Sequence, residues 1–442
     1  MNQKHSGLSA GHLVMMALGT VIGGSFFLGA SIPIRAAGPS VIIAYILGGA
    51  LVYYILYALS EMTVADADPG SFRSFAETAF GPGVGFVVGW VYWTGMILAI
   101  SSEAAAVSTF LRIWFPQISV PVMGSIIIIL VIIANLFGAK SLSKLESGLA
   151  FVKIAAIVGF IVLALALLSG IMTGTTKGIG AIGQEPFMLG GIAGIAGSML
   201  IVMFTYAGFE IIGLAASEAK DSQKTVPKAI TATVLWLVGL YCSAIFVILL
   251  LIPTSELSGD TSPLVAALEY RGIGWAAGAI NVVLVTAILS TMLAATFGLG
   301  RMMRSLADKG QAPIWLKDET EVPYRGIIFS GLAMLAGLGL GFILPKVYLF
   351  LVSSGGFALL FTYVVIVATH MKFRKKFGCP PNGKCQVPGY PVTSWITLLA
   401  LVAVIASMPL IEGQGSGLYA GLGLLVFYSI CYMVSKRGSR KV

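Results

Sequence analysis

The sequence predicts an all-α integral membrane protein with twelve transmembrane helices. Three observations lead to this fold class. The chain of 442 residues is 57% hydrophobic and only 10% charged, with a mean hydropathy of +0.95, whereas soluble domains carry about 25% charged residues. Apolar runs of about 20 residues, long enough to cross a bilayer as a helix, recur along the whole chain. The 54 glycines are typical of membrane helices, in which they let backbones approach closely.

Each predicted span is an apolar run that ends at polar, charged or glycine-rich sequence. The spans cover residues 12–33, 39–60, 83–110, 120–139, 146–169, 190–217, 229–252, 273–306, 326–344, 347–371, 391–411 and 417–436. The longest stretches outside them, 307–325 and 372–390, are too short for a soluble domain. An even number of spans places both termini on the same side of the membrane.

The basic residues predict which side that is. With a cytoplasmic N-terminus, 21 of the 27 Lys and Arg residues fall in cytoplasmic segments, and Lys153 lies within a span. The basic residues of the outside loops are Arg35, Arg112, Lys177, Arg271 and Lys346. Because positive charge concentrates on the cytoplasmic side of membrane proteins, both termini are predicted to be cytoplasmic. The net charge of +9 is then a topology signal and predicts no nucleic-acid partner.

Two predicted spans are interrupted at mid-membrane depth. Residues 19–25 of the first span read Gly-Thr-Val-Ile-Gly-Gly-Ser, and residues 204–210 of the sixth read Phe-Thr-Tyr-Ala-Gly-Phe-Glu, with Tyr206 and Gly208 in the expected unwound part. Any one of these glycines could simply pack helices together. Interruptions at matching places in two five-helix halves, however, indicate the central site of a transporter. Free backbone N–H groups there attract a carboxylate and free carbonyls attract an ammonium, which favours a zwitterionic solute.

Three ionisable residues lie within predicted spans, where a charge costs at least ~3 kcal/mol on insertion scales. Lys153 either extends its long side chain to the cytoplasmic interface or is a buried amine that loses its proton during transport. Glu210 follows the interruption of the sixth span, where it is either linked to protons or braces the broken helix. Glu103 lies on a small-residue face of the third span, where a plain hydrogen bond to a neighbouring helix is an equal alternative.

Signals of an enzyme, a cofactor or a metal site are absent from the sequence. The histidines lack metal-ligand spacing; they are His5, His12 and His370. Cys379 and Cys385 lie close together in one loop, but two thiols alone make a poor metal site. No P-loop is present, so ATP-driven transport would need a separate partner.

Seven motifs spread over nearly the whole chain carry a family resemblance. They are Gly19-Thr-Val-Ile-Gly-Gly-Ser-Phe-Phe-Leu-Gly29, Gly89-Trp-Val-Tyr-Trp93, Phe204-Thr-Tyr-Ala-Gly-Phe-Glu210, Glu218-Ala-Lys-Asp221, Val226-Pro-Lys-Ala-Ile230, Gly300-Arg-Met302 and Ala307-Asp-Lys-Gly-Gln-Ala-Pro313. With them the chain resembles the amino acid–polyamine–organocation transporters, in particular bacterial amino acid permeases of the plasma membrane. The resemblance implies one transmembrane domain with the leucine-transporter fold. Residues 12–169 and 190–371 would form two inverted five-helix repeats, and 391–436 two accessory helices.

The resemblance also implies where the substrate backbone binds. The positions that match the carboxylate-binding stretch are Gly23, Gly24 and Ser25. The carbonyls that match those holding the amino group belong to Val21, Phe204 and Ala207. Phe204 also matches an aromatic gate over the substrate. Two departures weaken any transfer of substrate choice: Ser25 directly follows Gly24, and Leu293-Ala294 replaces an Asn-Ser pair common in the eighth helix.

Proton coupling is implied by a second group of matching positions. Lys153 matches a lysine that takes the place of a sodium ion in some members of the family, with Ser290 or Thr291 as its neighbour. Glu210 matches a glutamate implicated in proton sensing. Together with Glu103, these residues form the candidate proton-coupling set and argue against sodium as the coupling ion.

The positions that match the side-chain pocket are apolar or small: Gly95, Met96, Ile100, Ala294 and Ala295. A buried cationic side chain would need an acidic partner, so we expect a neutral, aliphatic amino acid carried by alternating access with protons. An inward-facing Glu103 would instead favour an amine or a cationic amino acid. Exchange of amino acids is a further alternative, and a membrane sensor that binds without transport is an alternative of another class. The expected partners are the amino acid, protons and membrane lipid, with any accessory subunit or homo-oligomer left open.

Overall fold

The structure, a computed structural model, describes residues 8–66, 71–137, 139–171, 180–216, 219–320, 322–343, 346–378 and 386–438. Within these ranges the chain is a set of helices joined by loops, plus one isolated pairing between Leu8 and Ala219. This confirms the all-helical class predicted from the sequence. The two cysteines considered as metal ligands, Cys379 and Cys385, lie outside the described residues, as does Lys177.

Every predicted span coincides with one or more helices. These are α1 (Ala10–Val21) with α2 (Gly24–Phe27) and α3 (Ser31–Ala37), α4 (Val41–Ala65), α6 (Pro82–Leu111), α7 (Val120–Leu136), α8 (Ala139–Leu168), α10 (Gly191–Thr205) with α11 (Glu210–Leu214), α12 (Ser222–Leu251), α14 (Gly274–Asp308), α15 (Tyr324–Gly339), α16 (Val347–Phe377), α17 (Val392–Ser407) and α18 (Gln414–Gly438).

Length and composition support membrane spanning to different degrees among these helices. Among the described residues, eight segments are long and apolar enough to cross a bilayer, and α1, α7, α10 and α15 are shorter apolar helices. Two of these shorter helices, α1 and α10, end at the interruptions predicted for the first and sixth spans. The total of twelve spans and the inverted repeat stay predictions.

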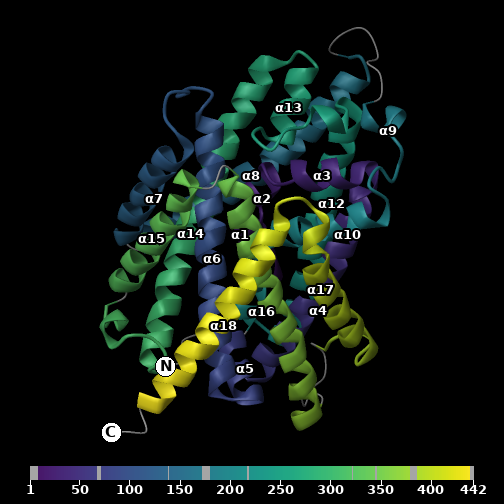
Figure 1. Cartoon of the computed structure of the whole chain (residues 1–442). Helices are drawn as coiled ribbons and strands as arrows, with labels where there is room; N and C mark the ends of the chain where they lie inside the picture. Colours follow the sequence, from purple (N-terminus) through teal and green to yellow (C-terminus); the bar gives the residue numbers. More distant parts are fainter. Residues whose placement is uncertain are drawn as a thin grey trace, which may run out of the picture.

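Three helices appear where the sequence predicted only connecting loops: α5 (Ser71–Phe80), α9 (Ala181–Gln184) and α13 (Pro263–Tyr270). They lie at the two ends of the bundle (Figure 1). Helix α5 lies at the end where α1 begins and α18 ends, and α9 and α13 lie at the opposite end. Short helices therefore cap the bundle at both ends.

Polar contacts hold α5 against the loop that follows α14. Arg73, only 3% exposed, donates through Nη1 to Gln311 Oε1 at 2.6 Å, and Lys309 Nζ donates to Ser74 Oγ at 2.7 Å. The Trp90 indole donates to the Gln311 carbonyl at 2.9 Å. The motif at 307–313, which carried part of the family resemblance, thus anchors α5 to α14 and to the start of α6.

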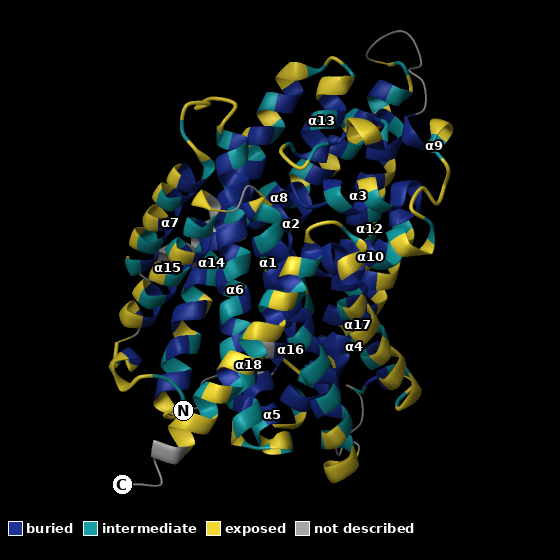
Figure 2. Ribbon diagram, viewed as in Figure 1, coloured by how far each residue is buried: buried dark blue, intermediate teal, exposed yellow. Residues whose placement is uncertain are grey.

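Burial follows the pattern expected of a membrane bundle. Figure 2 shows buried residues concentrated in the interior, and exposed residues along the outward faces of α7, α15 and α18. Many exposed side chains are large and apolar, including Leu130 on α7 and Leu235 on α12. In a soluble protein such an apolar surface would cause association with other molecules, whereas in a bilayer it faces lipid.

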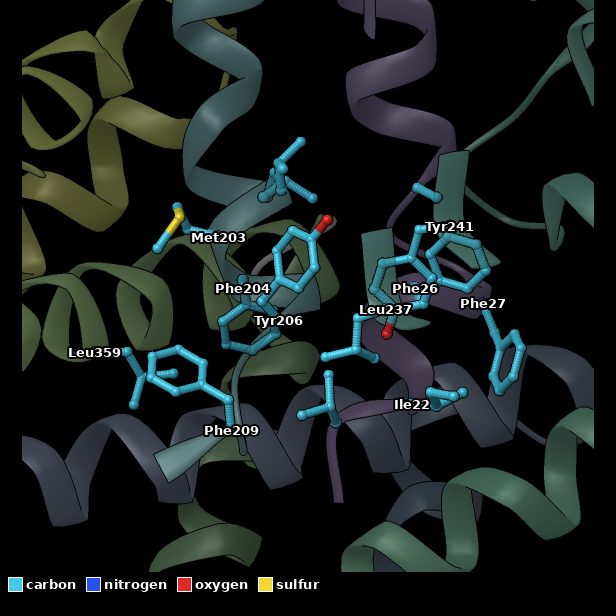
Figure 3. Packing of buried hydrophobic residues seen from close by; sticks show 14 of the residues in the cluster. Ile22, Phe26, Phe27, Met203, Phe204, Tyr206, Phe209, Leu237, Tyr241 and Leu359 are labelled. Carbon is cyan, nitrogen blue, oxygen red and sulfur yellow. The ribbon is translucent and has the colours of Figure 1, made fainter. Parts of the chain in front are cut away.

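An aromatic core joins the first break to α4, α12 and the turn after α10. The rings of Phe26 and Tyr241 stack with centroids 4.1 Å apart and planes 12° apart. Tyr45 contacts Tyr241 edge-on, and the Tyr206 hydroxyl donates to the Tyr45 carbonyl at 2.9 Å. Figure 3 shows Phe26 and Tyr241 across from Phe204 and Tyr206. These rings fix the two interrupted helices relative to α4 and α12.

A buried ionic cluster ties the end of α4 to the end of α16. The Glu61 carboxylate is fully buried, pairs with Arg374, lies 3.0 Å from His370 Nε2 and accepts the Val387 N–H at 2.9 Å. Arg374 in turn lies over the Tyr390 ring at 4.7 Å. The sequence prediction ended the second span at residue 60 and so gave Glu61 no buried role.

Removing this carboxylate is expected to destabilise the protein strongly. Glu61→Ala would remove the buried carboxylate that pairs with Arg374 and accepts the Val387 N–H, and breaking a buried ion pair from one side costs about 3 kcal/mol or more. The melting temperature of the detergent-purified protein should fall clearly. Glu412→Ala is the matched control, because the Glu412–Lys346 pair is exposed and surface pairs contribute little. Equal melting temperatures for the two variants would contradict the structural role of Glu61.

Candidate substrate site at two broken helices

The first break is a short extended segment between α1 and α2. Ile22 (φ −74°, ψ 103°) and Gly23 (φ −148°, ψ −163°) both have extended backbones, and α2 restarts at Gly24. Pairs of glycines favour such a break because each lowers helix stability by about 1 kcal/mol relative to alanine. The interruption lies where the sequence predicted it.

The second break separates α10 from α11. Residues 206–209 form turns, and Gly208 has φ +103°, which side chains other than hydrogen rarely allow. A Cβ on Gly208 would lie 2.9 Å from the Thr20 carbonyl oxygen. The Thr20 hydroxyl lies 3.1 Å from the Gly208 carbonyl oxygen and about as close to the Met16 and Ala17 carbonyl oxygens, so its one proton is donated to one of the three at a time. The last turn of α1, directly before the first break, therefore contacts the second break.

The breaks leave backbone groups open. In the part of the chain that the structure describes, the Val21 and Ala207 carbonyl oxygens accept no hydrogen bond from the protein. The Phe204 carbonyl differs, because it accepts the Ala207 N–H at 3.1 Å and so closes the turn. Two of the three carbonyls predicted to hold a substrate amino group are thus available, although that role stays a prediction.

Lys153 reaches the first break from α8. Its side chain is fully buried, and Nζ donates to the Gly19 carbonyl oxygen at 2.6 Å. A Cβ on Gly19 would lie 3.0 Å from Ala150 Cβ, so α1 and α8 approach closely at this point. The amine lies at the C-terminal end of α1, where helix carbonyls carry partial negative charge. Complete burial is incompatible with the alternative in which Lys153 extends to the cytoplasmic interface.

Glu103 faces the same break from α6. A Cβ on Gly23 would lie 2.5 Å from Glu103 Oε1 and 3.3 Å from Thr291 Oγ1. The Gly24 N–H, the Thr291 hydroxyl and the charge of Lys153 all act favourably on the ionised carboxylate. Thr291 has one hydroxyl proton and also lies 2.7 Å from the Ile288 carbonyl oxygen, so it donates to one acceptor at a time. Glu103 therefore turns inward, toward the unwound segment.

Glu210 braces the second break. Oε2 accepts the Gly208 N–H at 2.8 Å, and Oε1 accepts the Tyr363 hydroxyl of α16 at 2.5 Å. The Phe209 ring packs against Tyr363 with centroids 5.0 Å apart. Of the two roles considered for this residue, bracing the broken helix is the one with visible contacts, and proton sensing stays a prediction.

The residues predicted to surround a substrate side chain lie in different environments. Met96, Ala294 and Ala295 are partly exposed, whereas Ile100 is buried. The vacant Cβ position of Gly95 points at Ala358 of α16, 2.7 Å away, and so serves helix packing. Phe204 is 4% exposed, and a Cβ on Gly356 would lie 3.7 Å from its ring. Ser25 and Ser290 are buried at 8% and 3% exposure. The pocket and gate roles stay predictions.

Sequence reasoning missed two groups that contact the site. The Tyr348 hydroxyl of α16 lies 3.5 Å from the Gly24 carbonyl oxygen, and Thr20 crosses to the second break. Thr20 lies in the motif at residues 19–25, but sequence reasoning assigned its side chain no role, and Tyr348 has no unusual sequence context because tyrosine is common in apolar helices. Only their contacts in the structure, from α16 to Gly24 and from α1 to Gly208, identify these two residues.

Comparison with known proteins places the chain among transport proteins. The family described as "Amino acid permease" matches residues 12–435. The chain is 32% identical to a probable threonine/serine transporter of Bacillus subtilis, covering 98% of this chain and 96% of the relative. It is 30% identical to the gamma-aminobutyric acid permease of the same organism, covering 100% and 96%. It is also 32% identical to an L-asparagine permease of Streptomyces coelicolor, covering 91% and 84%.

Proposed function

This chain belongs to the amino acid permease family, and we propose that it carries a neutral, aliphatic amino acid together with a proton by alternating access. The family and its relatives are permeases and not enzymes, and the chain is a multi-pass protein of the plasma membrane. Threonine, serine, gamma-aminobutyric acid and asparagine, the substrates named for its relatives, carry no net charge at neutral pH. The choice of a neutral solute agrees with these names.

The contact between the two breaks is the observation that carries this proposal. A Cβ on Gly208 would meet the backbone of Thr20 and Val21, which supports a single site formed by the open Val21 and Ala207 carbonyls and the Gly24 N–H. An α-amino acid presents an ammonium and a carboxylate on one carbon, and these charges match carbonyl and N–H groups respectively. Met96, Ala294 and Ala295 then supply the apolar surroundings of an aliphatic side chain.

Coupling to protons is supported by Lys153. A fixed ammonium bonded to the Gly19 carbonyl occupies the end of α1, where a metal cation would otherwise be attracted. Loss or gain of its proton would change the attraction that holds α1 to α8. A ligand shifts a conformational equilibrium only through different affinities for its states, and this bond is one contact that can differ between them.

We further propose that both termini are cytoplasmic and that the twelve spans form two inverted repeats with two accessory helices. The distribution of basic residues supports this orientation. The arrangement of ends in Figure 1 agrees with it, because α1 begins and α18 ends at the same end of the bundle, beside α5.

Uptake into proteoliposomes tests the proposed function. We expect labelled L-leucine, L-valine or L-threonine to accumulate when the outside is more acidic, and a protonophore to abolish the accumulation. Uptake that needs unlabelled amino acid preloaded inside would show an exchanger instead. Saturable binding of the labelled amino acid without any flux would support the sensor alternative and contradict transport.

An amine or cationic amino acid is a second candidate, because Glu103 turns inward. A carboxylate beside the break could pair with a substrate cation. Competition separates the candidates: excess arginine or putrescine would inhibit uptake of the labelled substrate strongly in this case. Under the primary proposal, excess L-leucine inhibits and putrescine does not.

A further inference from the structure

The Glu103 carboxylate already occupies part of the site that a substrate carboxylate needs. One of its oxygens lies 2.5 Å from the position of a Cβ on Gly23, and the neighbouring Gly24 N–H acts favourably on its ionised form. The same N–H and the same unwound backbone form the region proposed to hold the substrate carboxylate. One backbone N–H and the space around it do not accommodate two ionised carboxylates.

We propose that Glu103 is a built-in competitor for the substrate carboxylate, so that an amino acid binds at Gly24 only once Glu103 has taken up a proton. This inference rests on the proposed function and specifies how its proton enters. A protonated carboxyl group no longer repels the substrate. It also gains an O–H donor, which can bond to the substrate carboxylate or to Thr291.

The charges around the break fit this exchange. Lys153 reaches the break from α8 and attracts Glu103. When Glu103 is protonated, the incoming substrate carboxylate replaces it as the anion near Lys153. The substrate ammonium brings its own positive charge to the open carbonyls, so the loaded site has gained one zwitterion and one proton. One substrate then carries one proton with it.

Among the residues that the structure describes, Lys153 is the one charged side chain found against Glu103. The groups that face Glu103 from neighbouring elements in the described part of the chain are Lys153 on α8, Thr291 on α14 and Tyr348 on α16. Helix α2, with the sequence Gly-Ser-Phe-Phe, carries no titratable group. Pairing of Glu103 with a substrate ammonium is the competing possibility, and it predicts the opposite response to neutralisation of Glu103.

The test compares substrate affinity across pH in the wild-type protein and in Glu103→Gln. The probe is labelled L-leucine, L-valine or L-threonine, whichever shows the highest uptake in the proteoliposome assay. Because binding takes up a proton, wild-type affinity should fall as pH rises, by up to about tenfold per pH unit. Glu103→Gln mimics the protonated side chain and should bind at all pH values at least as tightly as the wild type does at low pH. Its substrate counterflow should persist while proton-driven accumulation is lost.

Two other results would overturn the inference. An unchanged pH dependence in Glu103→Gln places the proton elsewhere, and a loss of affinity of tenfold or more at every pH means that Glu103 holds the substrate ammonium. Glu412→Gln, a change at a 94% exposed side chain, is the control and should behave as wild type.

A measurement on the unmodified protein covers the case in which Glu103→Gln does not fold. Calorimetric binding in buffers of different ionisation enthalpy should show about one proton taken up per substrate. No proton uptake, together with normal binding of a neutral amino acid, would overturn the role of Glu103 and leave the proposed substrate class standing. No binding or uptake of any neutral amino acid would instead contradict the proposed function.

Discussion

Replacing Gly208 with alanine is expected to lower uptake by about 30-fold. Gly208 has φ +103°, and a Cβ there would lie 2.9 Å from the Thr20 carbonyl oxygen. The obstacle is backbone, which cannot rotate away as a side chain would. Backbone strain of this kind costs about 1–3 kcal/mol, and 2 kcal/mol corresponds to about 30-fold in a rate or equilibrium constant. To relieve the clash, the added methyl group must push the second break away from α1. The substitution therefore acts on the proposed substrate site directly.

The measurement is initial uptake in proteoliposomes, normalised to folded protein. Gly239→Ala is the matched control: this glycine lies within α12, and a Cβ there would meet nothing within 4 Å. The control should retain wild-type uptake and gain slight stability from the better helix former. If Gly208→Ala transports as well as Gly239→Ala does, the contact between the breaks is not required for transport.

Lys153→Ala is expected to reduce proton-driven uptake at least ~10-fold. The substitution removes the buried charged donor to the Gly19 carbonyl and the cation that attracts the half-buried Glu103 carboxylate. The loss of a hydrogen bond from a charged donor costs about 1.5–3 kcal/mol. Lys224→Ala, at an exposed pair with Asp221, is the control and should transport normally.

A double substitution separates charge balance from a specific role of the amine. Lys153→Ala with Glu103→Gln removes both charges, so substrate binding should recover well above the level of Lys153→Ala alone. Accumulation driven by a proton gradient should stay absent. Full accumulation in the double variant would mean that neither residue couples protons, and failure of binding to recover would mean that Lys153 contacts the substrate site in its own right.

The sequence was sufficient for the positions of the long apolar helices and of both breaks. Apolar length identifies the spans, and Gly23, Gly24 and Gly208 lower helix stability at the places where the structure interrupts its helices. The short helices α5 and α13 escaped prediction because neither is long or apolar enough to signal a span. Tertiary contacts between residues far apart in the sequence hold such a helix in place, as Arg73 and Gln311 do for α5.

The direction in which Glu103 points could not be predicted, for a related reason. Helix α6 is apolar on all sides, since it contacts other helices nearly all round, so its sequence does not indicate which face turns toward α1. Glu61 was missed because it lies at the end of an apolar run, where charged residues usually reach solvent. Its partners on α16 and at Val387 are more than 300 residues away in the chain.

The contact between Thr20 and Gly208 has a consequence for leakage. Two hinges that moved independently could open the pathway on both sides at once, and solute and protons would then run down their gradients without doing work. Here the Thr20 hydroxyl lies 3.1 Å from the Gly208 carbonyl oxygen, and the Thr20 carbonyl leaves no room for a side chain at position 208. We expect this contact to couple movement of α1 to movement of the second break, so that the two sides of the pathway open in turn and not together.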